Sequence, residues 1–255
     1  MRATLRLALA WAACAVASGA ATDNHLLLAL PTPGPIAVDG RLDDWDASAR
    51  IPVCADTATL AGTYSAWVMM MYDAQALYVG VDWCDPTPMV NAYDPALDIE
   101  RRKCFHADSL HLHLRTDRES KLIGYWYTPG GRAAAIALDG WFPWDDKPIV
   151  YHDALAERGV TEAFQRRADG SGYVQELRIP WAAIVASGRA PQAGERFDCM
   201  LDLVWGPDSG HGWPVNHMMD LVAPGAVHTG WFWEVPRIYG QVELAAQGHR
   251  APPPT

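Results

Sequence analysis

The sequence predicts an all-β protein, namely an antiparallel, jelly-roll-like β-sandwich with one or two short helices. Segments in which apolar and polar residues alternate with period two dominate the chain, as expected for strands with one buried face. Clusters of Pro, Gly and Asp separate these segments, and long stretches with the helical period of 3.6 are scarce. A pattern of many short strands joined by turns is typical of sandwiches.

Eight segments have the pattern of strands. In chain order they are residues 65–71, 76–83, 109–115, 121–127, 133–138, 173–179, 197–205 and 239–244. Only residues 94–102 and 181–187 have a helical pattern, and the second follows Pro180, which suits the first turn of a helix. Four turn clusters, at residues 85–88, 128–131, 169–172 and 206–208, divide the strands.

The chain is organised as one domain behind an export signal. Residues 1–21 combine Arg2 and Arg6 with an apolar run and small residues suited to cleavage, which is the pattern of a signal peptide. We expect a lead-in over residues 22–34, a sandwich over 35–245 and a flexible tail over 246–255. No later stretch approaches the roughly 18 apolar residues of a membrane helix. The expected location is therefore periplasmic or extracellular, without a transmembrane segment.

Composition limits the partners. Apolar residues make up 50% of the chain and charged residues 20%, which is enough apolar material for a substantial core. The formal net charge of −10 repels phosphate backbones, so nucleic acid is not an expected partner.

Four cysteines follow the signal, namely Cys54, Cys84, Cys104 and Cys199. In an oxidising compartment they are disulfide candidates, and four cysteines allow three pairings between which the sequence does not choose. Free buried thiols are the alternative.

Several motifs in order resemble family 9 carbohydrate-binding modules. The segment "IAVDGRLDDW" (36–45) is similar to the opening of that family, and "MMMYDAQALYVGVDWCDPTP" (69–88) to its strand pair. The segments "HADSLHLHLRTD" (106–117), "GYVQELRIPWAAI" (172–184) and "YGQVEL" (239–244) continue the match over most of the chain. One departure is Ala107, which stands where the family usually has Gly.

This resemblance implies a β-sandwich that binds saccharide without catalysis. It also implies structural calcium as a candidate and, as an alternative, haem b, because the same superfamily includes the haem-b subunit of ethylbenzene dehydrogenase. Modules of this kind usually accompany an enzyme, so a partner enzyme or redox subunit is a further expectation.

The 12 tryptophans supply candidate residues for saccharide binding. Indole faces pack against the apolar faces of pyranose rings, while nearby polar groups bind the hydroxyls. Trp67, Trp83, Trp126, Trp181 and Trp205 lie in or beside strand patterns and are expected in the sandwich body. The predicted oligo- or polysaccharide site comprises loop residues Trp141, Trp144, Asp145, Trp213, Asn216, His228, Trp231 and Trp233.

Two metal hypotheses follow from polar clusters. Asp39, Asp43 and Asp44 surround a turn with oxygen ligands that suit calcium, although a solvated acidic turn is the simpler interpretation. His111 and His113 share one strand face opposite three leucines. Two imidazoles are too few for a metal site, so we expect a solvated outer face there.

Met70, His217 and Met218 are the candidate axial ligands of the haem-binding, electron-transfer alternative. No nucleophile motif, zinc-protease motif or nucleotide-binding loop is present in the sequence. We therefore expect no catalysis, although a carbohydrate-active hydrolase or lyase stays open, because 30 acidic residues always offer pairs that spacing alone does not test.

Overall fold

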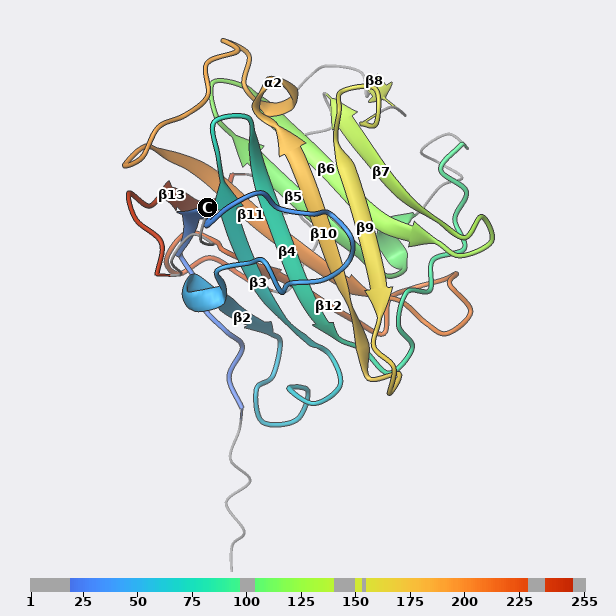
Figure 1. Cartoon of the computed structure of the whole chain (residues 1–255). Helices are drawn as coiled ribbons and strands as arrows, with labels where there is room; N and C mark the ends of the chain where they lie inside the picture. Colours follow the sequence, from blue (N-terminus) through green and yellow to red (C-terminus); the bar gives the residue numbers. More distant parts are fainter. Residues whose placement is uncertain (1–18, 97–103, 140–149, 153–154, 229–236, 250–255) are drawn as a thin grey trace, which may run out of the picture.

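A computed structural model describes residues 19–96, 104–139, 150–152, 155–228 and 237–249 (Figure 1). Within them, thirteen strands form one strongly bent sheet in the order β8-β7-β6-β5-β11-β13-β1-β3-β4-β10-β9, with β12 paired to β11 and β2 paired to β3. The predicted all-β fold is confirmed.

The bounds of the elements are β1 Leu26–Pro31, η1 Ala47–Ala49, β2 Ile51–Cys54, β3 Ser65–Tyr72, β4 Ala76–Cys84, η2 Cys104–His106, β5 Ser109–Arg115, β6 Glu119–Tyr127, β7 Arg132–Asp139, β8 Val150–His152, β9 Thr161–Arg166, β10 Gly172–Pro180, α2 Trp181–Ile184, β11 Arg196–Trp205, β12 Asn216–Asp220 and β13 Gly240–Leu244.

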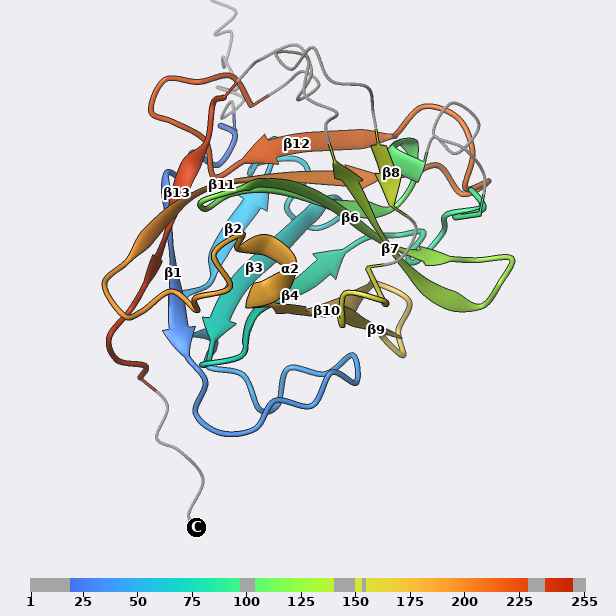
Figure 2. The ribbon, with the colours of Figure 1, turned by 90° about the horizontal axis from the view of Figure 1, so that it is seen from above.

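The bent sheet folds over into two layers. Viewed from above, β5, β6, β11 and β12 lie over β3, β4, β9 and β10, with β1 and β13 along the side where the sheet turns (Figure 2). We call the layer of β5, β6, β7, β11 and β12 the upper layer, and that of β3, β4, β9 and β10 the lower layer. Nearly all neighbouring strands are antiparallel, but β1 runs parallel to both β13 and β3.

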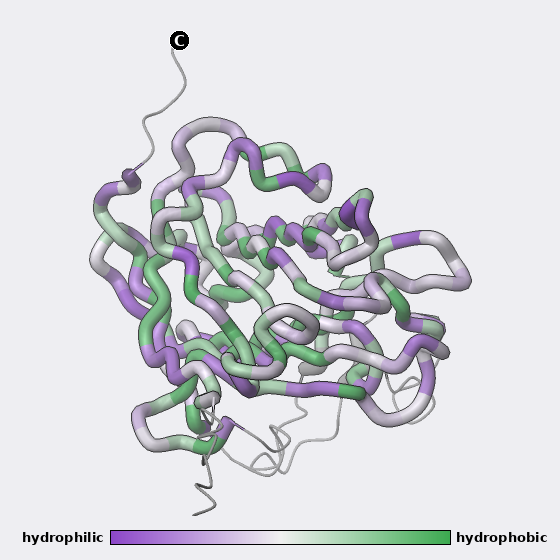
Figure 3. The backbone as a smooth tube through the Cα atoms, turned by 90° about the horizontal axis from the view of Figure 1, so that it is seen from below, coloured by the Kyte–Doolittle hydropathy of each residue, from purple (hydrophilic) through white to green (hydrophobic). Residues whose placement is uncertain are grey.

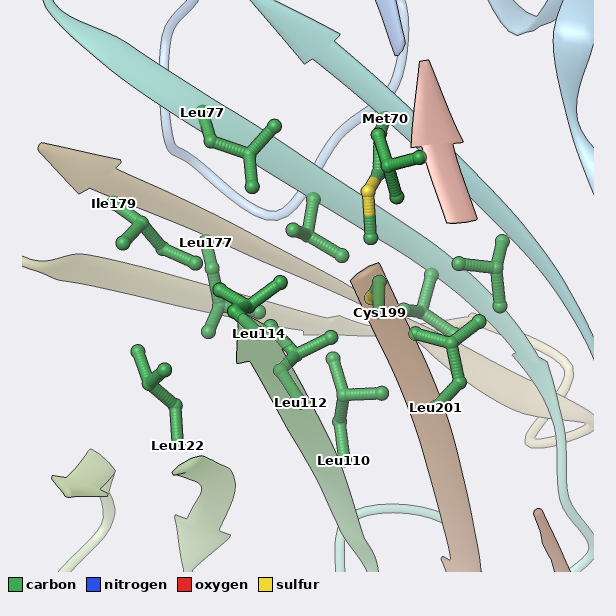
Figure 4. Close-up of a cluster of buried hydrophobic side chains, with 14 of the residues drawn as sticks. Met70, Leu77, Leu110, Leu112, Leu114, Leu122, Leu177, Ile179, Cys199 and Leu201 are labelled. Carbon is green, nitrogen blue, oxygen red and sulfur yellow. The ribbon is translucent and has the colours of Figure 1, made fainter. Parts of the chain in front are cut away.

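The core lies between the layers. Leu110, Leu112 and Leu114 of β5 point inward and face Leu77 of β4 and Ile179 of β10 (Figure 4). All five are at most 1% exposed, so each contributes about 1.5–3 kcal/mol through burial of its side chain. Hydropathy changes repeatedly along the backbone (Figure 3), in keeping with strands whose successive residues face opposite sides.

All eight predicted strand segments are strands, with ends displaced by two residues at most. Helix 181–187 is shorter than expected, ending at Ile184, and most of 94–102 lies outside the described residues. The sequence pattern missed β1, β2, β8, β9 and β12. Of these, β1 lies in the segment expected to be a lead-in, yet it is a strand between β13 and β3.

Cys54, Cys84 and Cys199 are free, so the predicted disulfides are wrong for these three residues. Cys54 lies opposite Ser65, which in turn lies opposite Cys84. Two strand spacings place Cys54 and Cys84 about 10 Å apart, beyond the roughly 7 Å between Cα atoms that a disulfide spans. The side chain of Cys104 lies outside the described residues.

Among the described residues, no helix has the length and apolar character needed to cross a membrane.

Candidate functional site

Five ionisable side chains gather on the outer face of the upper layer. They are His111 and His113 of β5, Lys121 of β6, Asp202 of β11 and His217 of β12; we call them the polar cluster. The strand register produces it, because His111 lies opposite Asp202 and His113 lies opposite Lys121. The expectation that His111 and His113 face solvent is wrong, since both are buried. The alternation of residues along β5 assigns the side chains to the correct two faces of the sheet. The outer face, which holds His111 and His113, is buried as well.

Asp202 connects two imidazoles of the polar cluster. Its Oδ2 lies 3.4 Å from His111 Nδ1, and its Oδ1 forms an ion pair with His217 Nε2. Burial acts to raise the pKa of Asp202, but the attraction of His217 and His111 outweighs it and holds the pKa well below its ordinary value. Burial likewise acts to lower the pKa of His217, yet Asp202 outweighs it and raises the pKa. These directions give a charged His217–Asp202 pair.

The other two imidazoles are held neutral. Burial lowers the pKa of His111 to about 4, although Asp202 partly opposes the shift. Burial, together with the charge of Lys121, lowers the pKa of His113 well below its ordinary value. The polar cluster therefore combines one ion pair, a buried lysine and two neutral imidazoles.

Apolar groups border the polar cluster on two sides. One group comprises Ile123, Tyr125, Ala134 and Ile136, with Tyr93, Phe105 and Tyr127 packed against it. The other comprises Met200, Met219, Val222 and Tyr239. His217 is the most accessible member, since 12% of its side chain is exposed, whereas the other four residues are at most 1% exposed. The edge of the cluster open to a ligand is therefore at His217, on β12.

Trp213 lies on the loop that leads into β12 and is 69% exposed. Its ring stacks on His106, with centroids 4.5 Å apart and an interplanar angle of 30°. His106 contacts Phe105, which packs against the apolar group on the outer face. The Tyr93 hydroxyl accepts a hydrogen bond from Gly212 N at 2.9 Å, which fixes the loop beside Trp213. The exposed indole is thus anchored at the edge of the upper layer.

Two other predicted residues lie on the same stretch of chain. Asn216 begins β12, and its Nδ2 is enclosed without a hydrogen-bond partner among the described residues. His228 is occupied with structural contacts, because Nδ1 lies 3.0 Å from Met219 O and Nε2 lies 3.0 Å from Asp23 Oδ1. The structure therefore places Trp213 on the loop at the start of β12, whereas Asn216 lies on the opposite face of β12 from His217, and His228 ties β12 to the N-terminal segment.

The remaining predicted binding residues, Trp141, Trp144, Asp145, Trp231 and Trp233, lie outside the described residues. The segment with the first three connects β7 of the upper layer to β8. The segment with the other two follows His228, which contacts β12. Among tryptophans expected in the body, Trp67 is an exception, because it is 40% exposed on β3 under the guanidinium of Arg50.

The acidic turn around Asp39 is organised by its own backbone. Asp39 Oδ1 accepts from Arg41 N, Asp43 pairs with the Arg41 guanidinium, and Asp44 accepts from Ala37 N. The acid at the centre is Glu176, whose Oε2 accepts three backbone N–H groups while Oε1 accepts from the Trp45 indole. In the part of the chain that the structure describes, no three His, Cys, Asp or Glu residues are placed to hold a metal ion.

The candidate haem ligands lie on the two sides of the upper layer. Met70 and Met218 are buried in the core between the layers (Figure 4 shows Met70). His217 neighbours Met218 on β12 and therefore points to the opposite face. His217 therefore does not share a slot with Met70 or Met218.

Sequence reasoning missed Lys121 and Asp202. Each is a charge on the non-core face of an otherwise apolar strand, in "KLIGYWY" and "FDCMLDLVW". Charged residues on such a face ordinarily indicate exposure to solvent, so the local sequence holds no signal for the burial of these two side chains.

No family model matches the sequence, and no curated protein matches it. Solved structures do match. A family 9 carbohydrate-binding module from Caldicellulosiruptor kristjanssonii in complex with cellotriose is 18% identical, with a TM-score of 0.51 over 90% of this chain and 98% of that chain. The module in complex with glucose is 17% identical, with a TM-score of 0.50 over 89% of this chain and 100% of that chain. This protein therefore has the fold of a family 9 carbohydrate-binding module.

Proposed function

We propose that this protein is an exported, non-catalytic saccharide-binding protein whose site is the β12 edge of the upper layer. The observation that carries the proposal is an exposed indole, Trp213, fixed on His106 next to a face that holds a buried polar cluster. The modules that share the fold, and whose structures contain cellotriose and glucose, support the ligand class.

The chemistry of the edge suits a pyranose. A sugar ring presents C–H groups to an aromatic face, and Trp213 offers such a face to solvent. Hydroxyl groups need charged or polar partners, and His217, whose side chain is 12% exposed, lies four residues along the chain from Trp213. Because Asp202 fixes the His217 ring, its hydrogen-bonding atoms are oriented before the sugar arrives, which lowers the entropic cost of binding.

The predicted residues Trp141, Trp144, Asp145, Trp231 and Trp233 would extend the same site. In the chain their segments follow β7 and His228. A second indole in the site would enclose a sugar ring, whereas Trp213 alone forms an open platform.

Export rests on the sequence of residues 1–21. Because Cys54, Cys84 and Cys199 are free thiols, disulfides do not support the prediction of an oxidising compartment. Mass spectrometry of the protein recovered from cells tests export, because a mature chain beginning near Thr22 is expected, and an intact N-terminus would contradict it.

Titration calorimetry with cellotriose and with glucose tests the site. Trp213→Ala is expected to weaken binding about tenfold or more, because aromatic stacking contributes about 1.5 kcal/mol and 1.4 kcal/mol corresponds to a factor of ten. Trp67→Ala is the matched control, since it removes another exposed tryptophan from the lower layer. Equal affinities of the Trp213→Ala protein and the wild type would refute the proposed site.

A further inference from the structure

Asp108 joins the two chain segments that hold the loop bearing Trp213. We call residues 206–215, between β11 and β12, the Trp213 loop. Asp108 Oδ1 accepts a hydrogen bond from Gly206 N at 2.7 Å, at the base of this loop. Asp108 Oδ2 accepts a hydrogen bond from Val90 N at 2.8 Å. One buried carboxyl group therefore fixes the base of the Trp213 loop to the segment that begins at Val90.

The same segment supports the middle of the Trp213 loop. Ala92 N donates a hydrogen bond to Gly210 O at 3.1 Å, and Tyr93 Oη accepts one from Gly212 N at 2.9 Å. A Cβ atom at Gly210 would lie 2.8 Å from Ala92 N, so the two backbones are in direct contact. The position of the exposed indole therefore depends on how firmly this segment is held to the base of the loop.

A second buried acid, Asp85, faces Asp108. Asp85 Oδ1 accepts a hydrogen bond from Thr87 N at 2.8 Å, but Oδ2 is enclosed without a donor group among the described residues. The carboxyl groups of Asp85 and Asp108 contact each other, and they hydrogen-bond when one of them carries a proton. A buried oxygen without a donor is unfavourable, and two adjacent carboxylates repel each other. A single proton held between the two acids relieves both effects.

The surroundings of the two acids favour this shared proton. Burial, together with the charge of Asp85, raises the pKa of Asp108 well above its ordinary value. Burial likewise raises the pKa of Asp85, although hydrogen bonds to it and the charge of Arg166 partly oppose the shift. Tyr173 of β10 and Cys84 of β4 also face the acids. Burial raises the pKa of both, so they stay uncharged near neutral pH, and Arg166 of β9 supplies the nearby positive charge.

We propose that Asp108 is a positioning residue of the saccharide site, and that a proton shared with Asp85 keeps the Trp213 loop in its binding position. This inference rests on the function proposed for Trp213. It adds that saccharide affinity falls as the pH rises, because the ordered loop holds a proton that the displaced loop releases.

Repulsion between the two acids displaces the loop when the proton is lost. Asp85 directly follows β4 and Asp108 directly precedes β5, so the sheet holds the backbone of both residues. The repulsion therefore turns the Asp108 side chain away from Gly206 N and Val90 N. The Trp213 loop then loses the connection at its base, while the strands stay in place.

Fluorine NMR of the full chain labelled with fluorotryptophan tests the positioning without any sugar. The Trp213 resonance is identified by its loss in Trp213→Phe. Between about pH 5 and pH 9 it should move in the wild type but not in Asp85→Asn, because the amide donates to Asp108 at every pH and adds no charge. His106 and His211 contact the same loop in both proteins, so their effects cancel in this comparison.

Calorimetry with cellotriose over the same pH range measures the effect on binding. The affinity of the wild type should fall about tenfold as the pH rises, which is the loss expected for Trp213→Ala, and Asp85→Asn should remove this fall. Asp117→Asn is the matched control, because this exposed acid also accepts two backbone hydrogen bonds, from Ala186 N and Ser187 N, but lies beyond the other end of β5. It should behave as the wild type.

The two measurements separate this inference from the proposed function. The same pH response of the Trp213 resonance in the wild type and in Asp85→Asn would overturn the inference, whether or not sugar binds. A resonance that responds as expected, in a protein that binds no cellotriose at any pH, would refute the proposed function and leave Asp108 as the residue that positions the loop.

Discussion

Acidification should destabilise this protein through His111. In the folded chain, burial lowers the pKa of His111 to about 4, whereas an exposed histidine titrates near 6.5. Between these two values the unfolded chain binds a proton that the folded chain refuses, so stability falls as the pH falls. Each pKa unit corresponds to about 1.4 kcal/mol, so the loss of folding free energy through His111 between pH 7 and pH 4 is about 3 kcal/mol.

Urea denaturation at about pH 7, 5.5 and 4 measures this contribution as a difference between the wild type and His111→Asn. The variant lacks the titrating ring. Between pH 7 and pH 4, its free energy of unfolding should therefore fall by about 3 kcal/mol less than that of the wild type. His211→Asn, which removes an exposed imidazole, is the control and should follow the wild type. Identical pH dependence of His111→Asn and the wild type would show that His111 is not held neutral by burial.

Three further predictions concern stability. Glu176→Gln should cost about 2 kcal/mol or more, because an amide replaces a carboxylate that accepts four hydrogen bonds; an unchanged urea midpoint would contradict the role of this turn. Leu112→Ala should cost about 3 kcal/mol in the same assay, since the side chain is fully buried between the layers, and a loss below about 1 kcal/mol would argue against that packing. Dithiothreitol should leave the thermal midpoint unchanged, because Cys54, Cys84 and Cys199 are free; a fall of several degrees would reveal a disulfide.

Most of the sheet could be predicted from the sequence because one face of each predicted strand packs in the core. β5 illustrates this, since Leu110, Leu112 and Leu114 alternate with polar residues and all three point inward. The strands that the sequence did not predict lack a regular alternation of apolar and polar residues. β1 is a nearly continuous apolar run, "LLLALP", and β9 is mostly polar, "TEAFQR", as suits a strand at the end of the sheet.

The candidate site could be predicted only in part. The exposure of Trp213 could be predicted from its position in a Pro- and Gly-rich loop, and its side chain is exposed in the structure. The polar cluster could not be predicted, because alternation assigns His111 and His113 to a second face but does not reveal whether other chain segments cover it. The contact between Asp202 and His217 also depends on the pairing of β11 with β12, which local sequence does not specify.

A crystal structure of the full chain soaked with cellotriose tests the central claim most directly. We expect one glucosyl ring stacked on the indole of Trp213 and a sugar hydroxyl hydrogen-bonded to His217. Cellotriose bound at another surface, or no sugar on Trp213 at saturating concentration, would contradict the account.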